Sequence, residues 1–280
     1  GVIGACTALE LSRSGKKVLT VDKNAAAGYG STSGSCAIIR TYYSLLDSCA
    51  LSYEGWFYWK NWADYIGQAD PRGMIKYHDT GCLVVKAEHN GGLKKACEMM
   101  DKINCPYDHL TPAQMKERLP IIDTHQFTPA KRPDQEGFGE PTGESIEGGV
   151  FFHRGGYVND PALAAQNAEH AAKLAGADFL YKVEVADIRR AEGRVAGITL
   201  TDGREIDAPV VVNVAGPHSF KINQMAGVLD GMKMKTRALR HEVSHVPSPE
   251  SYDFEKEGCV YSDSDISTYC RPELGNHILI

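Results

Sequence analysis

Two glycines and one aspartate near the amino end have the types and spacing of a nucleotide-binding turn. Gly1 and Gly4 are placed like the last two glycines of G-x-G-x-x-G, and Asp22 comes 21 positions after Gly1, where about 20 are expected. Glycines let backbone N–H groups approach a pyrophosphate at a helix N-terminus, and an acid at this distance accepts hydrogen bonds from a ribose diol. We therefore predict a dinucleotide site.

A helix and a strand must hold these residues, and the sequence supplies both. Apolar residues at helical spacing follow Gly4, Gly15 ends the predicted helix, and residues 18–21 form a strand closed by Asp22. A βαβ unit also needs a strand before its glycines, and residues 275–280 stop within a predicted strand. We expect the chain to be an internal piece of a longer enzyme.

Composition bounds the class of protein. The 280 residues suggest two domains, 42% hydrophobic content supports a core, and the net charge of −6 argues against a nucleic-acid partner. No apolar run is long enough for a transmembrane segment. The eight cysteines form no C-x-x-C pair, which favours reduced thiols over a metal site. We predict no metal and a cytoplasmic location, with a mitochondrial location as the alternative.

Local patterns along the chain predict helices and strands. We expect helices at residues 48–66, 93–103, from Pro112 onward and 162–174, with Thr111 and Asp160 as N-caps. The aromatic residues of the first of these helices are expected in the core. We expect strands at residues 80–85, 181–185, 209–215 and 238–246, and a small antiparallel meander over 186–206. Residues 124–147, rich in Pro, Gly, Thr and Glu, are expected to form a long surface excursion.

Four stretches, in this order, give the chain a family resemblance: GVIG…VDK, GSTSGSCAIIR, GGYVNDP and VVNVAGPHS. Together they resemble the flavin-dependent amine and amino-acid oxidoreductases of the D-amino-acid oxidase type, which include sarcosine oxidase, glycine oxidase, and sarcosine and dimethylglycine dehydrogenases. The resemblance implies an α/β fold with a Rossmann-like FAD-binding domain interleaved with a mixed-sheet substrate domain. We expect the FAD-binding domain at 1–75 and 154–228, and the substrate domain at 76–153 and 229–280.

The resemblance implies FAD as the cofactor and assigns residues to its parts. Gly1 and Gly4 would hold the pyrophosphate, and Asp22 and Lys23 would lie at the ribose end of the site. The other cofactor-binding residues would approach the flavin side (Ser31, Thr32 and Cys36), meet the adenine through the backbone (Val183 or Val185), or line the diphosphate (Ala215 and Gly216).

The resemblance also implies substrate-binding residues. In the run Ala37-Ile38-Ile39-Arg40, Arg40 matches an arginine that holds the substrate carboxylate in the sarcosine-oxidase branch, and a guanidinium can grip a carboxylate with two parallel hydrogen bonds. The first arginine of that pattern is replaced here by Ala37. Tyr269 falls where that branch has a tyrosine in the substrate pocket. Gly34 stands where the dehydrogenase branch carries a flavin-linked histidine, so covalent attachment through this loop is not expected.

The resemblance therefore implies oxidation of the C–N bond of a small amino acid or N-methyl amino acid, of the sarcosine, glycine or D-amino-acid type. A hydride would pass to the flavin, and water would hydrolyse the imine. Oxygen or an electron carrier would accept the electrons. Two alternatives remain open at this point: an NAD-dependent dehydrogenase, and a non-catalytic flavin-binding subunit.

Overall fold

The computed structural model describes residues 1–87 and 90–280, which form two compact units, each assembled from three segments of the chain. Unit 1 consists of Gly1–Ser35, Ala63–Ile75 and Asp160–Glu242. Unit 2 consists of Cys36–Trp62, Lys76–Asn159 and Val243–Ile280. The interleaving expected from the resemblance is present, but packing groups residues 36–62 with unit 2 rather than with the glycine turn. The assignment of residues 1–75 and 154–228 to FAD binding, and of 76–153 and 229–280 to substrate binding, stays a prediction.

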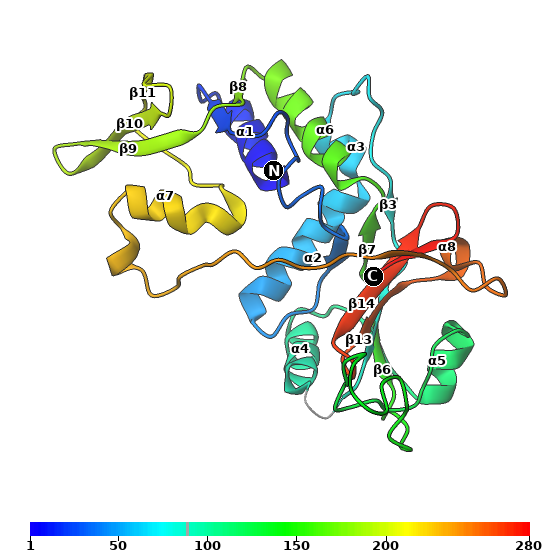
Figure 1. The fold of residues 1–280 in the computed structure, drawn as a ribbon. Helices are drawn as coiled ribbons and strands as arrows, with labels where there is room; N and C mark the ends of the chain where they lie inside the picture. Colours follow the sequence, from blue (N-terminus) through cyan, green and yellow to red (C-terminus); the bar gives the residue numbers. More distant parts are fainter. Residues whose placement is uncertain (88–89) are drawn as a thin grey trace. The chain divides into compact units, whose positions relative to one another are not determined.

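Unit 1 is built on two helices and a parallel strand pair. Its elements are α1 (Val2–Arg13), β1 (Leu19–Asp22), most of α3 (Trp62–Ile66), α6 (Pro161–Leu174), β8 (Asp178–Tyr181), β9 (Val185–Ala191), β10 (Arg194–Leu200), β11 (Glu205–Asp207), α7 (Ser219–Met225) and two short 3-10 turns, Gly216–His218 and Leu229–Gly231. Helices α1 and α6 pack side by side (Figure 1), and small buried alanines on both let the backbones approach closely. Asp22 pairs with Tyr181 at the end of the parallel β1–β8 ladder.

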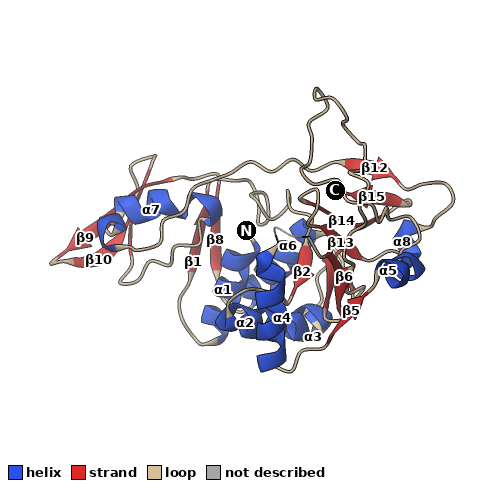
Figure 2. Ribbon diagram, turned by 90° about the horizontal axis from the view of Figure 1, so that it is seen from below, coloured by secondary structure: helices blue, strands red, loops and turns tan. Residues whose placement is uncertain are grey.

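Unit 2 is built on a mixed sheet with helices on both faces. Its elements are β2 (Ile38–Arg40), α2 (Leu46–Lys60), β3 (Tyr77–His78), β4 (Cys82–Val85), α4 (Gly91–Lys102), β5 (Tyr107–Leu110), α5 (Pro112–Arg118), β6 (Gly149–Phe152), β7 (Gly155–Val158), β12 (His245–Pro247), α8 (Phe254–Glu257), β13 (Val260–Asp263), β14 (Thr268–Glu273) and β15 (His277–Leu279). The main sheet has the order β12-β15-β14-β13-β4-β6-β5, and among the pairs of its described strands β13–β4 alone is parallel. Figure 2 shows β12, β15, β14, β13, β6 and β5 gathered in this sheet. A second sheet has the order β2-β7-β3.

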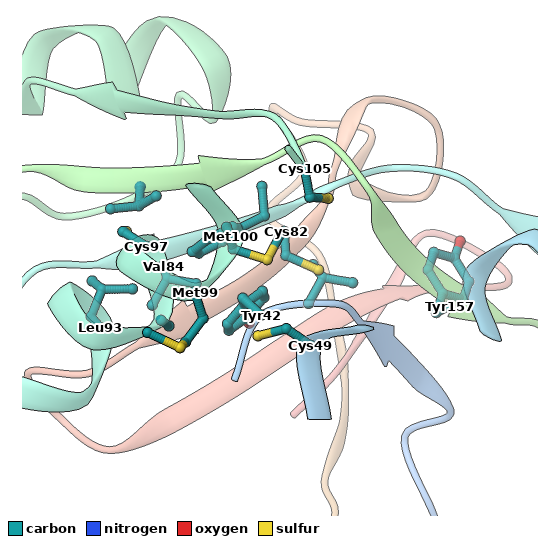
Figure 3. Packing of buried hydrophobic residues seen from close by; sticks show 14 residues of the cluster. Tyr42, Cys49, Cys82, Val84, Leu93, Cys97, Met99, Met100, Cys105 and Tyr157 are labelled. Atoms are coloured by element: carbon teal, nitrogen blue, oxygen red, sulfur yellow. The ribbon is translucent and has the colours of Figure 1, made fainter. Parts of the chain in front are cut away.

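Strand β4 explains how the main sheet is buried on both faces. All four of its residues are buried, and successive side chains point to opposite sides. Cys82 and Val84 pack with Met99 and Met100 of α4 (Figure 3), whereas Leu83 and Val85 pack with Met115 of α5. The apolar run of the sequence therefore forms a central strand between two helical layers.

Several local predictions are confirmed. Thr111 caps α5 in a full capping box with Gln114, Asp160 caps α6, and the meander forms the antiparallel sheet β11-β10-β9. The excursion 124–147 contains no helix, and Asp265 anchors its base by accepting hydrogen bonds from the Phe127 backbone N–H and the Thr128 hydroxyl.

Three strand predictions and one helix prediction are wrong. Within the predicted strand 181–185, residues 182–184 form a break between β8 and β9, and Lys182 there has a φ of +58°. Residues 209–215 form no strand, and Val210 is 71% exposed. Of the predicted strand 238–246, only its end belongs to β12. The single helix expected over 48–66 is two helices, interrupted at Asn61.

The segment 209–215 is not a strand because it hydrogen-bonds to no other strand of the described chain. In the described part of unit 1 the parallel ladder consists of β1 and β8 alone, and this segment pairs with neither. The Asn213 side chain forms local hydrogen bonds instead: its amide nitrogen donates to the Ser219 carbonyl and to Asn223 Oδ1, and its oxygen accepts from the Ala215 backbone N–H. β-branched residues favour a strand only where a partner strand is present.

The aromatic residues of α2 and α3 are only partly in the core. Trp56 and Trp62 are buried, but Phe57 and Tyr58 are each 48% exposed.

Within residues 1–87 and 90–280, none of the helices has the length and apolar character needed to span a bilayer.

Candidate functional site

The start of α1 in unit 1 presents backbone N–H groups that have no intrahelical acceptor, beside a carboxylate. Gly1 is the N-cap and makes no side-chain cap hydrogen bond, and the first-turn N–H groups of any α-helix have no intrahelical acceptor. The nitrogen of Gly1 lies 3.8 Å from Asp22 Oδ2, while Asp22 Oδ1 accepts from the Asn24 backbone N–H at 2.9 Å. The positive end of the α1 dipole and the Asp22 carboxylate, which can accept hydrogen bonds from a ribose, thus lie at one corner of unit 1.

The small-residue loop lies against this corner. The Val2 backbone N–H donates to Thr32 Oγ1 at 3.1 Å, and a Cβ added to Gly1 would meet the same oxygen at 3.0 Å. A Cβ added to Gly4 would meet Val214 Cγ2 at 3.1 Å. A larger residue at either position would therefore push Thr32 or Val214 aside, so glycine suits the close approach of this turn to the loop and to residue 214.

A second turn, at Ala215 and Gly216, reaches the same loop. Gly216 has a φ of +59°, a conformation that favours glycine, and its missing Cβ would lie 3.7 Å from Ser31 Oγ. The structure thus brings together Gly1, Gly4, Asp22, Ser31, Thr32, Ala215 and Gly216, seven of the residues that the sequence pointed to. Three chain segments meet at this corner, which combines a helix start, two glycine turns and hydroxyl side chains and so fits a diphosphate.

The other three unit 1 candidates lie near the same end of β1 as Asp22. The Val183 backbone N–H bonds to the Asp22 carbonyl at 3.4 Å, and Val185 opens β9; both side chains are partly buried in the same apolar cluster. Lys23 forms an exposed ion pair with Glu184, with Nζ and Oε1 3.7 Å apart. Its ammonium is therefore shared with the protein's own carboxylate.

The substrate candidates lie in unit 2, where Arg40 ends β2. Its guanidinium carbon lies 4.5 Å from the ring centroid of Tyr43 and 5.5 Å from that of Tyr42. Burial lowers the pKa of Arg40, but the two tyrosines outweigh this and leave the pKa raised, so the group stays cationic. Among the described residues, Arg40 forms no ion pair with a carboxylate.

Tyr269 and Cys36 lie within the electrostatic reach of this arginine. Burial raises the pKa of Tyr269, Cys36 adds to the rise, and the charge of Arg40 opposes it. Burial also raises the pKa of the Cys36 thiol, which keeps it neutral. Arg40, Tyr269 and Cys36 therefore belong to one neighbourhood of unit 2, with Tyr269 43% exposed.

Sequence reasoning missed one residue of this neighbourhood, the buried Arg271. Its Nε donates to the Cys36 carbonyl at 2.5 Å, and its Nη2 pairs with Glu273 at 2.9 Å. The signal was available, because an arginine and a glutamate two apart in a strand share one face and can pair.

In the described chain, no group of three or more His, Cys, Asp or Glu side chains is placed to hold a metal ion.

The parallel strand pair, the helix start and the carboxylate at the strand end define unit 1 as a dinucleotide-binding α/β fold. A family model described as FAD dependent oxidoreductase matches residues 1–280, and the chain belongs to this family. The family is FAD-dependent, so FAD is the cofactor and the nicotinamide alternative is wrong.

Solved structures agree with this fold. L-proline dehydrogenase from P. horikoshii superimposes with a TM-score of 0.74 at 21% identity, covering 100% of this chain and 66% of that protein. Glycine oxidase from Bacillus cereus ATCC 14579 gives a TM-score of 0.71 at 22% identity, covering 100% and 68%. Iminodiacetate oxidase from Chelativorans sp. BNC1 gives 0.67 at 19%, covering 100% and 68%. The chain thus spans about two thirds of the length of these proteins. A comparison with curated protein sequences gives no match.

Proposed function

We propose that this protein oxidises the C–N bond of a small amino acid or N-methyl amino acid. The observation that carries the proposal is the corner of unit 1 where the α1 start, Asp22 and two glycine turns meet. FAD bound there would accept a hydride from the substrate carbon next to nitrogen, leaving an imine that water hydrolyses. Oxygen or an electron carrier would take up the electrons.

The chain's own residues hold the cofactor in this proposal. The α1 N-terminus and the Gly1 turn bind the diphosphate, with Ala215 and Gly216 lining its other side. Asp22 accepts hydrogen bonds from the adenosine ribose, and Lys23 lies beside it. The backbone at Val183 or Val185 meets the adenine. Three further residues approach the flavin side: Ser31, Thr32 and Cys36.

Arg40 binds the substrate carboxylate, and Tyr269 orients the amine or the carboxylate. Arg40 suits this role because it is cationic, has no carboxylate partner among the described residues, and rests on two aromatic rings that restrict its motion. The chemical step then depends on placement of the substrate carbon rather than on a general base, provided that the amine binds in its neutral form.

The decisive experiment is anaerobic mixing of the flavin-loaded protein with sarcosine, glycine, D-alanine and L-proline, following loss of the oxidised flavin absorbance. L-Proline and glycine are included because the structurally similar proteins are described as a proline dehydrogenase and a glycine oxidase. Bleaching by at least one of these substrates is expected. Flavin that binds but is bleached by none of the four would favour the alternative of a non-catalytic flavin-binding subunit.

Two substitutions test the residue roles. Asp22→Ala should weaken FAD binding by the apoprotein about tenfold or more, because a hydrogen bond to a charged group contributes about 1.5–3 kcal/mol. Arg40→Met should weaken binding of carboxylated substrates to a similar extent. Arg154→Met is the matched control, since Arg154 also rests on an aromatic ring, with its guanidinium carbon 4.9 Å from the ring centroid of Trp56. Wild-type affinity in Arg40→Met would remove Arg40 from the substrate site.

A further inference from the structure

Arg271 is the largest fully buried side chain of the protein's described residues, with only 2% of its surface exposed. Burying a cation is costly unless it is paired and hydrogen-bonded. All three nitrogens of the Arg271 guanidinium have a partner. Nη2 forms an ion pair with Glu273 at 2.9 Å, Nη1 donates to the Pro272 carbonyl at 2.6 Å, and Nε donates to the Cys36 carbonyl at 2.5 Å. Two of these partners are its neighbours on β14.

The third partner is distant in sequence and shows what the side chain holds. Cys36 lies 235 positions before Arg271, and its carbonyl is the last peptide group before Ala37. Ala37 has a φ of +52°, which is unusual for a residue with a Cβ. A charge-assisted hydrogen bond to the preceding carbonyl helps to offset the cost of that conformation.

The strained turn at Ala37 sets the direction of β2. From Ala37 the chain enters Ile38–Arg40, which pairs with β7, and the Val158 N–H donates to the Ala37 carbonyl at 3.0 Å. Arg271 contacts β7 as well, because its guanidinium carbon lies 4.7 Å from the Tyr157 ring centroid. One side chain thus contacts both strands of the β2–β7 pair where β2 begins, at the Ile38–Tyr157 pair, and Arg40 ends the same three-residue strand.

Strand alternation places Tyr269, Arg271 and Glu273 on the same face of β14. Tyr269 is within the electrostatic reach of Cys36 and Arg40, so the face that carries Arg271 is turned toward the segment that carries Arg40. The geometry supports a link from β14 to the candidate carboxylate-binding arginine through the Cys36 carbonyl.

We propose that Arg271 is a positioning residue that fixes the Cys36–Ala37 turn and thereby aims Arg40 at the substrate carboxylate. This inference rests on the proposed function. It predicts that Arg271 acts on carboxylate binding through Arg40, whereas a purely structural role would alter stability alone.

The test uses the flavin-loaded, full-length enzyme and acetate, a carboxylate that cannot be oxidised at a C–N bond. Affinity is measured by equilibrium titration of the flavin absorbance, and folding by far-UV circular dichroism. Arg271→Lys keeps the charge beside Glu273 but loses the fork that reaches Cys36. It should weaken acetate binding about tenfold, the equivalent of one charge-assisted hydrogen bond. Arg154→Lys, the matched control, should leave the affinity unchanged.

A double-mutant cycle separates positioning from a general effect. In an Arg40→Met background, Arg271→Lys should change acetate affinity less than twofold, because the group it positions is gone. A folded Arg271→Lys enzyme with wild-type affinity, or an equal loss in both backgrounds, overturns the inference while leaving the proposed role of Arg40 intact. If Arg40→Met itself binds acetate normally, both the inference and the carboxylate role of Arg40 fail.

A second variant decides the matter if Arg271→Lys does not fold. Glu273→Gln retains the guanidinium but weakens the ion pair that orients it. We expect the same pattern with a smaller loss of acetate affinity, again absent in the Arg40→Met background. Unchanged affinity in folded Glu273→Gln overturns the inference in that case.

Discussion

Replacing Asp70 with Asn should destabilise unit 1 by about 2 kcal/mol at neutral pH, and the loss should shrink as the solution is acidified. The Asp70 side chain has no exposed surface. It accepts hydrogen bonds from Arg72 Nε at 2.9 Å, Arg72 Nη2 at 2.9 Å and Asn167 Nδ2 at 2.8 Å, which ties residues 63–75 to α6. Asn keeps the shape of this side chain but removes its charge.

The magnitude follows from the pKa of Asp70. Burial alone would raise this pKa, but the hydrogen bonds from Arg72 and Asn167 outweigh burial and lower the pKa from 3.8 to about 2. Each pKa unit corresponds to about 1.4 kcal/mol. Because the folded-state pKa is the lower one, the stabilisation is complete above pH 4 and is lost as the pH falls toward 2. At pH 3 about half of it should remain.

The assay is urea unfolding of wild type and Asp70→Asn at pH 7, 5 and 3. Far-UV circular dichroism is the appropriate signal, since the three tryptophans, at positions 56, 59 and 62, all belong to unit 2. Asp202→Asn is a matched control: Asp202 also accepts from Arg204 two residues later, at 2.8 Å, but in an exposed turn. Its effect should be much smaller. A difference for Asp70→Asn that is the same at pH 7 and pH 3 would refute the electrostatic reasoning.

Two further substitutions test how the site is supported. Gly156→Ala should lower stability by about 2 kcal/mol or more, measured by thermal unfolding, because the added Cβ would overlap the His78 carbonyl oxygen within the β2-β7-β3 sheet; an unchanged melting temperature would contradict this. Asp265→Ala should speed limited proteolysis within residues 124–147 several-fold, since the Phe127 N–H and the Thr128 hydroxyl lose their common acceptor. Equal cleavage rates would show that Asp265 does not anchor the excursion.

Local rules predicted the parts of the fold that depend on neighbouring residues. The glycine turn, the α1 pattern and the caps at Thr111 and Asp160 are set by backbone donors and side chains a few positions apart, and each appears in the structure. Such rules could not show that residues 209–215 lack a partner strand. Pairing depends on which other segments reach the same edge, and this information is not local.

Some residues of the candidate site could likewise be predicted from the sequence, and others could not. The resemblance pointed to Arg40 and Tyr269 separately, and the structure adds that both belong to one neighbourhood with Cys36. The resemblance did not point to Arg271, and the spacing of Arg271 and Glu273 indicates that they share a strand face but not that the arginine is buried. Only the fold shows that the carbonyl of Cys36 completes the hydrogen bonding of this guanidinium.

The alternation of the chain between its two units affects how the protein can fold during synthesis. The parallel partner of β4, which contains Cys82, is β13, which begins at Val260; the partner of β1 is β8, which begins at Asp178. Neither sheet can close while its later strand is still inside the ribosome. Contacts this distant in sequence make folding slow, and the apolar face of β4 must stay protected meanwhile. We therefore expect the nascent protein to depend on chaperones, and neither unit to be obtainable by cutting the gene at a single point.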